Sequence, residues 1–497
     1  MSRSRLRSAI KLLHLPVAVA AAASLALPEG SVAGALSVGW LLLTVLIGLN
    51  GLLRILKRGF VPIAQCSIDA AMIYLPLGGL WFAAYRFGMQ VMDFSQVIVS
   101  LTAIHFHYSA FAVPMFAGFS GLLMQRVTPS YRLAAAGAVI GPLLVAAGIT
   151  ISPMLEAVTV AVYTACLLIY VYYSLVVARQ YASFLLALSS IAFLLTMGFA
   201  LVYGIGRGIG GEIVSIPTMV LIHGIGNAFG YTGLGLLAWT QLRPQQHIRE
   251  TRFPMSGVRG QRVIGRSFLD RNGLIDHGAG TVLGLVDDFE VFRGGEFDPS
   301  LVHPRLQDFY ERTINYELVA STRWLRGFAA LSGVYKRIVE RLEQLNLPLN
   351  GEGVAQRMGS AIVPVDSRRD GRDRVRAWVR WDEDNGKAIF IALYSHHRDH
   401  NIGYMNIALP LPFGNMAGIL KPSNDHGDGL VLTSKPQGQS VGDEGVYFVL
   451  QGFPLRLPLN ETFHVRPDAE GSLRATHRMW MFGVPFLQIE YVIFSKE

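Results

Sequence analysis

Eight apolar stretches, each about as long as a bilayer is thick, occupy the first half of this chain and constrain its fold most. A helix needs about 20 mostly apolar residues to cross the hydrocarbon core of a membrane. Charged or turn-forming residues separate the stretches. The sequence therefore predicts an α-helical polytopic membrane bundle of about eight transmembrane helices over residues 1–240, with spans at 10–27, 32–53, 62–85, 95–123, 132–151, 155–177, 183–205 and 212–239.

Basic residues gather at one set of helix ends. That set holds Arg3, Arg5, Arg7, Lys11, Arg54, Lys57, Arg58, Arg126, Arg132, Arg179 and Arg243, and the other set holds Arg86 and Arg207. Loops rich in Lys and Arg stay in the cytoplasm. We therefore predict a multi-pass protein of the bacterial inner (plasma) membrane, in contact with membrane lipids, with both termini cytoplasmic.

The net charge of +8 agrees with this topology. Because no aromatic-plus-basic pattern accompanies the charge, we predict that the protein binds no nucleic acid. Cys66 and Cys166 both lie in apolar stretches and indicate no disulfide framework or metal spacing.

The second half reads as a soluble chain. We expect a linker and irregular segment at 241–300 and a cytoplasmic α+β, β-rich domain at 301–497. Residues 304–346 are helical by pattern, with a second helix at roughly 333–345, and short alternating strands follow from Ala361 onward. Asp384-Asn385-Gly386 is a strong hairpin signal. The domain is predicted as an antiparallel sheet or partly closed β-barrel against one or two helices, which could enclose an apolar ligand or be solid.

Ionisable side chains at membrane depth are costly, so each is a candidate functional residue. His105 and His223 each lie about 15 Å below the same predicted membrane surface, at 1.5 Å of rise per residue. Both begin the pattern His-x-x-x-[Ser/Asn]-Ala-Phe. The candidate intramembrane site comprises Asp69, His105, His107, Tyr108, Ser109, His223 and Asn227.

Two readings of these histidines stay open. They could ligate a metal or haem, relay protons or bind a polar head group. They could instead be interhelical hydrogen-bond partners of Ser109 and Asn227. Residues i and i+2 of a helix point about 200° apart, so His105 and His107 cannot face one pocket unless the helix is distorted. Pro114 and Pro217 each free a carbonyl nearby.

Catalytic motifs are absent: the sequence holds no nucleophile elbow, phosphate loop or zinc-protease signature. Whether the protein is an enzyme therefore stays open. The cluster from Ser395 to His400 favours a solvated turn over a metal site.

The membrane motifs Thr102-Ala-Ile-His105-Phe-His107-Tyr108-Ser-Ala-Phe and His223-Gly-Ile-Gly-Asn227-Ala-Phe-Gly-Tyr231 resemble those of the YndJ-like family of bacterial membrane proteins. The soluble half adds Tyr404-Met-Asn406-Ile-Ala-Leu-Pro410-Leu-Pro412-Phe, Asp443-Glu444-Gly445-Val-Tyr447 and Leu457-Pro-Leu-Asn460-Glu461-Thr, which resemble the longer members. The resemblance implies this two-part architecture and supplies no catalytic residue.

Three functional hypotheses follow. The first is an intramembrane histidine site that handles a lipophilic molecule, a metal or haem, with His105, His107 and His223 as the candidate metal ligands. The second is a lipid-binding or transfer module in the β-rich domain, anchored by the bundle. The third is a proton-coupled transporter that uses Asp69 and the histidines.

Overall fold

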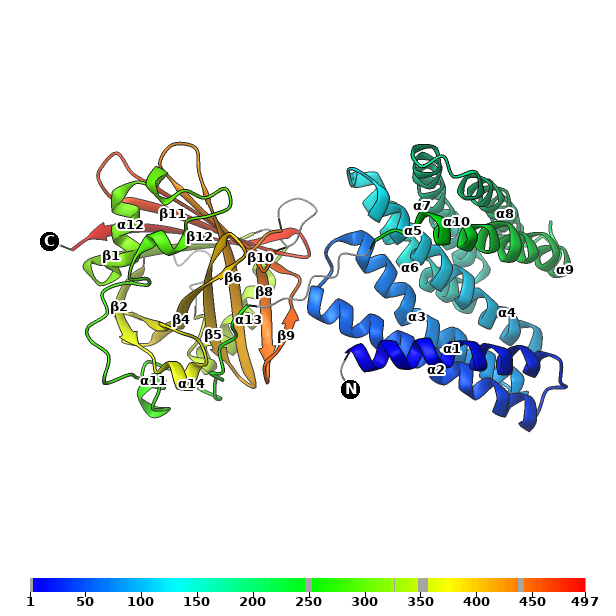
Figure 1. Ribbon diagram of the computed structural model, residues 1–497, viewed down its shortest axis with the longest axis horizontal. Coiled ribbons are helices and arrows are strands. Elements are labelled where there is room, and N and C mark those ends of the chain that lie inside the picture. The colour runs from blue at the N-terminus through cyan, green and yellow to red at the C-terminus, as the bar shows by residue number, and fades with distance from the viewer. Residues whose placement is uncertain are drawn as a thin grey trace. The chain divides into compact units, whose positions relative to one another are not determined.

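The computed structural model describes residues 3–211, 213–245, 253–325, 327–346, 356–436 and 442–496. The chain divides into two compact units, Met1–Ile248 and Arg249–Glu497. Figure 1 draws the first unit as helices and the second mostly as strands. Each unit is considered by itself.

The first unit is a helix bundle, as predicted. Its described residues include eight helices that are long and apolar enough to cross a membrane. They are α1 (Arg3–Leu25), α2 (Ser31–Arg58), α3 (Ile63–Arg86), α4 (Gln96–His107) continuing as α5 (Val113–Leu123), α6 (Pro129–Ile151), α7 (Pro153–Gln180), α8 (Phe184–Gly208), and a last helix from α9 (Ile216–Met219) to α10 (Leu234–Leu242).

Small residues allow α2 and α3 to approach closely. A Cβ atom on Gly79 would lie 2.3 Å from the Thr44 hydroxyl, and one on Gly48 would lie 2.5 Å from the Pro76 ring. Lipid tails are as apolar as the helix surfaces, so membrane helices associate through such close packing.

Both spans that carry the candidate histidines are distorted. The fourth span contains a π-helical turn at Tyr108–Ala112, just before Pro114. The eighth contains two, at Val220–Gly224 and Gly226–Gly233, after Pro217. The turn at Tyr108–Ala112 contacts that at Gly226–Gly233. Such turns are rare in proteins as a whole, but many of those that occur lie at functional sites.

The second unit is a closed antiparallel β-barrel. Ten of its described strands form the ring, in the order β5-β4-β3-β2-β1-β12-β11-β10-β7-β6, and β6 pairs again with β5. The ring strands are β1 (Tyr316–Trp324), β2 (Gln356–Pro364), β3 (Arg376–Asp382), β4 (Ala388–Asp399), β5 (Ile402–Leu411), β6 (Gly414–Asn424), β7 (Leu430–Thr433), β10 (Leu459–Pro467), β11 (Leu473–Met481) and β12 (Val484–Ser495). Strands β8 (Gly445–Leu450) and β9 (Phe453–Arg456) extend the sheet from β6.

Apolar side chains fill both faces of part of the barrel wall. Inward residues of the ring form the main core with Phe289, Phe292 and Phe309 from the preceding segment. Outward residues such as Ile391 and Leu393 pack under Ile264 and Phe268. The segment that we predicted as a linker is thus irregular in backbone and, within its described part, packed against the barrel.

The prediction that residues 304–346 are helical is wrong in the centre of the segment, whereas the second helix expected at roughly 333–345 is present. The structure has α12 at Pro304–Glu311 and α13 at Ala329–Leu342, with strand β1 between them. Burial alternates along most of β1, and the strand pairs with β2 on one side and with β12 on the other. Tertiary pairing therefore overrides the helical pattern.

The predicted turn at Asp384–Gly386 joins β3 and β4, as expected. The predicted solvated turn from Ser395 to His400 is wrong, because Ser395 to Asp399 extend β4. The His397 side chain is 8% exposed there and lies 2.8 Å from the Asn406 amide oxygen and 3.2 Å from Asp443.

Candidate functional site

Asp69 links α3 to the end of α2. Its fully buried carboxylate lies 2.5 Å from the Arg54 Nε atom and forms a second ion pair with Arg58. Arg54 also donates to the Gln65 side chain at 3.1 Å. Two cations thus offset the one buried carboxylate and tie the two helices together.

His107 is committed to an interhelical contact. The Trp40 indole N–H of α2 donates to its Nε2 atom at 2.9 Å, and the two rings stack. An indole nitrogen only donates, so His107 Nε2 must be unprotonated. Its Nδ1–H therefore donates to the Ala103 carbonyl, 2.8 Å away. His107 is a neutral imidazole with both ring nitrogens in hydrogen bonds.

His223 is similarly engaged, with α8. Its Nδ1 atom lies 2.9 Å from the Thr196 carbonyl, which can only accept, and its Nε2 atom lies 3.2 Å from the Asn227 amide nitrogen. The Thr196 hydroxyl donates to the Asn227 amide oxygen at 2.7 Å. The predicted partnership of His223 with Asn227 is present as a closed network.

His105 differs from the other two histidines. Its Nε2 atom is buried, and no described residue forms a hydrogen bond with it. His223 is near enough to act on it electrostatically. Ser109, the expected partner of His105, instead lies 3.1 Å from the Tyr163 hydroxyl. Tyr108 begins the π-helical turn.

The structure therefore directs His107 to α2 and His223 to α8, and places Asp69 in a separate ion-pair cluster. Among the residues described, no group of three His, Cys, Asp or Glu side chains could hold a metal ion. A functional intramembrane site stays a prediction.

The barrel interior holds a second candidate site, with a cavity of about 140 Å³. Its walls are mostly aliphatic and aromatic side chains from alternate positions of the strands. Leu285, Phe309 and Tyr310 contribute from before β1, and Leu345 contributes from after α13.

Besides the indole of Trp378, six polar side chains line this cavity: Tyr310, Arg380, Tyr394, Glu461, His477 and Tyr491. Glu461 and His477 pair at 3.0 Å across β10 and β11, and Phe463 stacks on the imidazole at 3.7 Å. Burial lowers the pKa of Arg380 and raises the pKa values of Tyr394 and Tyr491. Both tyrosines therefore remain neutral hydroxyl groups at physiological pH.

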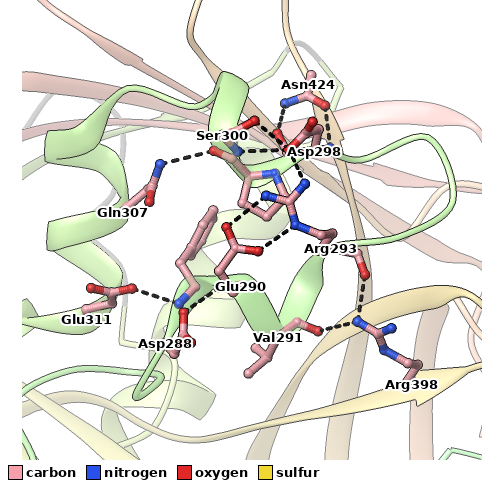
Figure 2. A network of polar contacts seen from close by, with 12 residues as sticks. Asp288, Glu290, Val291, Arg293, Asp298, Ser300, Gln307, Glu311, Arg398 and Asn424 are labelled. Carbon is pink, nitrogen blue, oxygen red and sulfur yellow. Dashed lines mark hydrogen bonds and ion pairs between the residues drawn. The ribbon is translucent and has the colours of Figure 1, made fainter.

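Residues 282–313, which we call the plug, pack against the barrel core and bond to Asn424 at the β6–β7 turn, which marks the plug end of the barrel. Figure 2 shows its polar scaffold: Arg293 pairs with Glu290 at 2.6 Å and with Asp298 at 2.6 Å. Asn424 exchanges two hydrogen bonds with the Asp298 backbone, at 2.8 and 2.9 Å. Arg398 of β4 donates to the Arg293 carbonyl at 2.6 Å. These bonds fix the plug to β4 and β6.

The sequence reasoning missed Arg380. Strand β3 has apolar residues on both faces, Trp378 inward and Val379 outward. From sequence alone, an arginine in such a strand is expected to face solvent. Its inward position becomes evident only when the strands are seen to close into a barrel. Arg380 lies two positions after Trp378, on the same face of β3, and this spacing was the available signal of its inward position.

These features define a multi-pass membrane protein with a closed antiparallel β-barrel in its C-terminal half. The profile of the YndJ-like protein family matches residues 1–231. The "Uncharacterized membrane protein YndJ" of Bacillus subtilis (strain 168) is 37% identical over 462 residues, which are 93% of this chain and 84% of that protein. The chain belongs to the YndJ-like family, as its motifs predicted. No solved structure matches it.

Proposed function

We propose that the barrel takes up a small apolar or amphipathic molecule and that the helix bundle anchors it at the membrane. The observation that carries this proposal is the cavity of about 140 Å³ with mostly apolar walls. An engineered apolar cavity of about 150 Å³ stays dry and accepts benzene. A guest of that size fits directly, and a longer one requires a segment at a barrel end to move.

The barrel end opposite the plug supports a bilayer source for this molecule. Exposed apolar residues gather there on α13 and on three hairpin turns: Val334, Ile338, Phe413, Leu450, Phe482 and Val484. Phe413 is 82% exposed and Phe482 is 67% exposed. We call this surface the apolar end.

Helix α13 adds basic charge to the apolar end. Arg337 and Arg341 are exposed at helical spacing from Val334 and Ile338, so the four side chains share one face. Apolar side chains mixed with arginines suit the surface of an anionic bilayer. In our proposal, this end lies on the cytoplasmic leaflet of the bacterial inner membrane, with both termini cytoplasmic as the basic helix ends indicate.

The test measures binding of octanol to the full-length protein in lipid nanodiscs. Ala392 lines the cavity, so Ala392→Phe should fill it and reduce protein-specific binding at least tenfold. Val492→Phe adds the same ring to the outward face of β12 and is the matched control, expected to bind as wild type. Equal octanol binding by wild type and Ala392→Phe would contradict the proposal.

A second candidate is the intramembrane site at His105, favoured by its buried, unpartnered Nε2 atom. It would handle a lipophilic molecule, a metal or haem beside His223. Elemental analysis and the visible absorption spectrum of the purified protein test it. A stoichiometric transition metal or a haem band that His105→Ala removes supports this candidate, and a colourless, metal-free protein opposes metal and haem. A proton-coupled transporter gains no comparable support, since two arginines hold Asp69.

A further inference from the structure

Arg380 is a buried cation without a buried anion to match it. Its side chain is 5% exposed, and its Nε atom has no hydrogen-bond partner among the described residues. No described carboxylate forms an ion pair with it. Two other buried arginines of this unit differ, since Arg372 pairs with Asp370 at 2.6 Å and Arg376 pairs with Asp287. A buried charge is costly unless it is paired.

Aromatic rings hold the Arg380 guanidinium in place. Its central carbon lies 3.7 Å from the centre of the Phe390 ring, 4.2 Å from that of Trp378 and 5.7 Å from that of Tyr491. Cation–π contacts of this kind offset part of the cost of burial. These contacts engage the faces of the planar guanidinium and satisfy none of its N–H donors. Tyr491 forms one hydrogen bond with the group.

The nearby carboxylate is already engaged. Glu461 bonds to His477 at 3.0 Å. It acts electrostatically on Tyr394 and Tyr491, and no ion pair between Glu461 and Arg380 is present among the described residues. The cavity wall therefore presents one guanidinium with an unpartnered Nε atom, three tyrosine hydroxyls, the Glu461–His477 pair and an otherwise mostly apolar surface.

We propose that Arg380 binds the carboxylate of an amphipathic ligand whose short hydrocarbon tail fills the remaining cavity. This inference rests on the proposed function and specifies its ligand class. A planar guanidinium matches a carboxylate in two parallel hydrogen bonds. The Tyr491 hydroxyl lies beside it as a further donor. A tail of limited length follows from the cavity volume of about 140 Å³.

The test compares three probes with the same tail: octanoate, octanol and octylammonium. Binding is measured on the full-length protein in nanodiscs, and the uptake by the cavity-filled Ala392→Phe protein is subtracted as lipid background. We expect the wild type to bind octanoate at least tenfold more tightly than octanol and to reject octylammonium. Arg380→Met keeps much of the volume without the charge, so it should bind octanol as before and lose the preference for octanoate.

A stability measurement separates ligand binding from a purely structural role. Without ligand, Arg380→Met removes an unmatched buried charge and should unfold at a temperature no lower than the wild type. Equal affinities of the wild type for octanoate and octanol, or an Arg380→Met protein that still prefers octanoate, would overturn this inference and leave the proposed function standing. Failure of all three probes to bind the wild type would overturn both.

Discussion

Gln344 and Ile391 exchange two hydrogen bonds where strands β4 and β5 separate. The Gln344 Oε1 atom accepts from the Ile391 backbone N–H at 2.9 Å, and its Nε2 atom donates to the Ile391 carbonyl at 3.0 Å. The same amide donates to the Pro410 carbonyl of β5 at 3.1 Å. The β4–β5 ladder ends at Leu393 and Ala408. One side chain thus closes the barrel wall beside Leu345, which lines the cavity.

Gln344→Ala should therefore loosen this part of the wall. The change leaves the buried Ile391 N–H without its acceptor, which costs about 1–3 kcal/mol of unfolding free energy. Hydrogen exchange of a peptide spanning residues 388–393 should speed up by at least tenfold. Gln488→Ala, on the outward face of β12, is the control and should leave that exchange unchanged. Unaltered protection in Gln344→Ala would show that the wall does not depend on this side chain.

His107 and His105 should respond differently to replacement by alanine. Hydrogen bonds between membrane helices average about 0.6 kcal/mol and reach about 1.7 kcal/mol. His107→Ala loses the bond from Trp40 and the ring stacking, so we expect a loss of about 1–2 kcal/mol in stability. His105→Ala removes no interhelical hydrogen bond that the structure describes, and should cost less. Thermal unfolding in detergent measures both, and equal destabilisation would contradict this assignment.

Asp69 should matter more to folding than either of its arginines. Asp69→Asn leaves the buried Arg54 and the largely buried Arg58 without their anion, and breaking a buried ion pair in this way costs about 3–5 kcal/mol. Arg58→Met should cost less, because Asp69 keeps Arg54. The yield of folded protein and its unfolding temperature in detergent give the order. A larger loss for Arg58→Met than for Asp69→Asn would refute the account of this cluster.

Acid should destabilise the barrel through His396. Burial, followed by the charges of Arg374 and Arg376, lowers the pKa of His396 below its ordinary value of 6.5. The unfolded chain therefore binds this proton first, and the stability is lost as the pH falls below about 6.5. Barrel unfolding should occur at a lower temperature at pH 5.5 than at pH 7.5. His396→Gln should reduce that difference, and an unchanged difference would exclude His396 as its source.

The apolar end and the plug end should differ in their depth in the membrane. A tryptophan placed by Phe482→Trp at the apolar end should be quenched by brominated lipids in nanodiscs, after subtraction of the native signal. Phe494→Trp lies towards the other end of the barrel, is also exposed, and should not be quenched. Equal quenching at both positions would contradict contact of the apolar end with the bilayer.

The helix bundle was predictable because hydropathy and length alone identify a membrane span. The sequence also indicated the distortions near Pro114 and Pro217, since a proline removes a helical donor. It could not indicate that Trp40 donates to His107, because the two residues lie 67 positions apart in the chain and on different helices. Histidines in a span look alike in sequence, and the neighbouring helices decide which of them are satisfied.

The barrel was predictable only in outline. Strand β6 carries a weak strand signal in the sequence, because glycine and proline are depleted in strands and it contains Gly414, Gly418 and Pro422. These glycines have a packing reason: a Cβ on Gly414 would lie 2.2 Å from the Val449 carbonyl, and one on Gly418 would lie 2.6 Å from Glu461. The ring closes through the pairing of β5 with β6. The cavity and the inward position of Arg380 therefore depend on β6, a strand with a weak sequence signal.

Native mass spectrometry of the protein purified from its own membranes tests the central claim most directly. The wild type should carry a small non-covalent ligand, released as a carboxylic acid with a hydrocarbon tail, and the Ala392→Phe protein should lack it. A wild type that carries no bound small molecule under conditions that preserve non-covalent contacts, with a mass state identical to that of Ala392→Phe, would contradict a ligand-binding barrel.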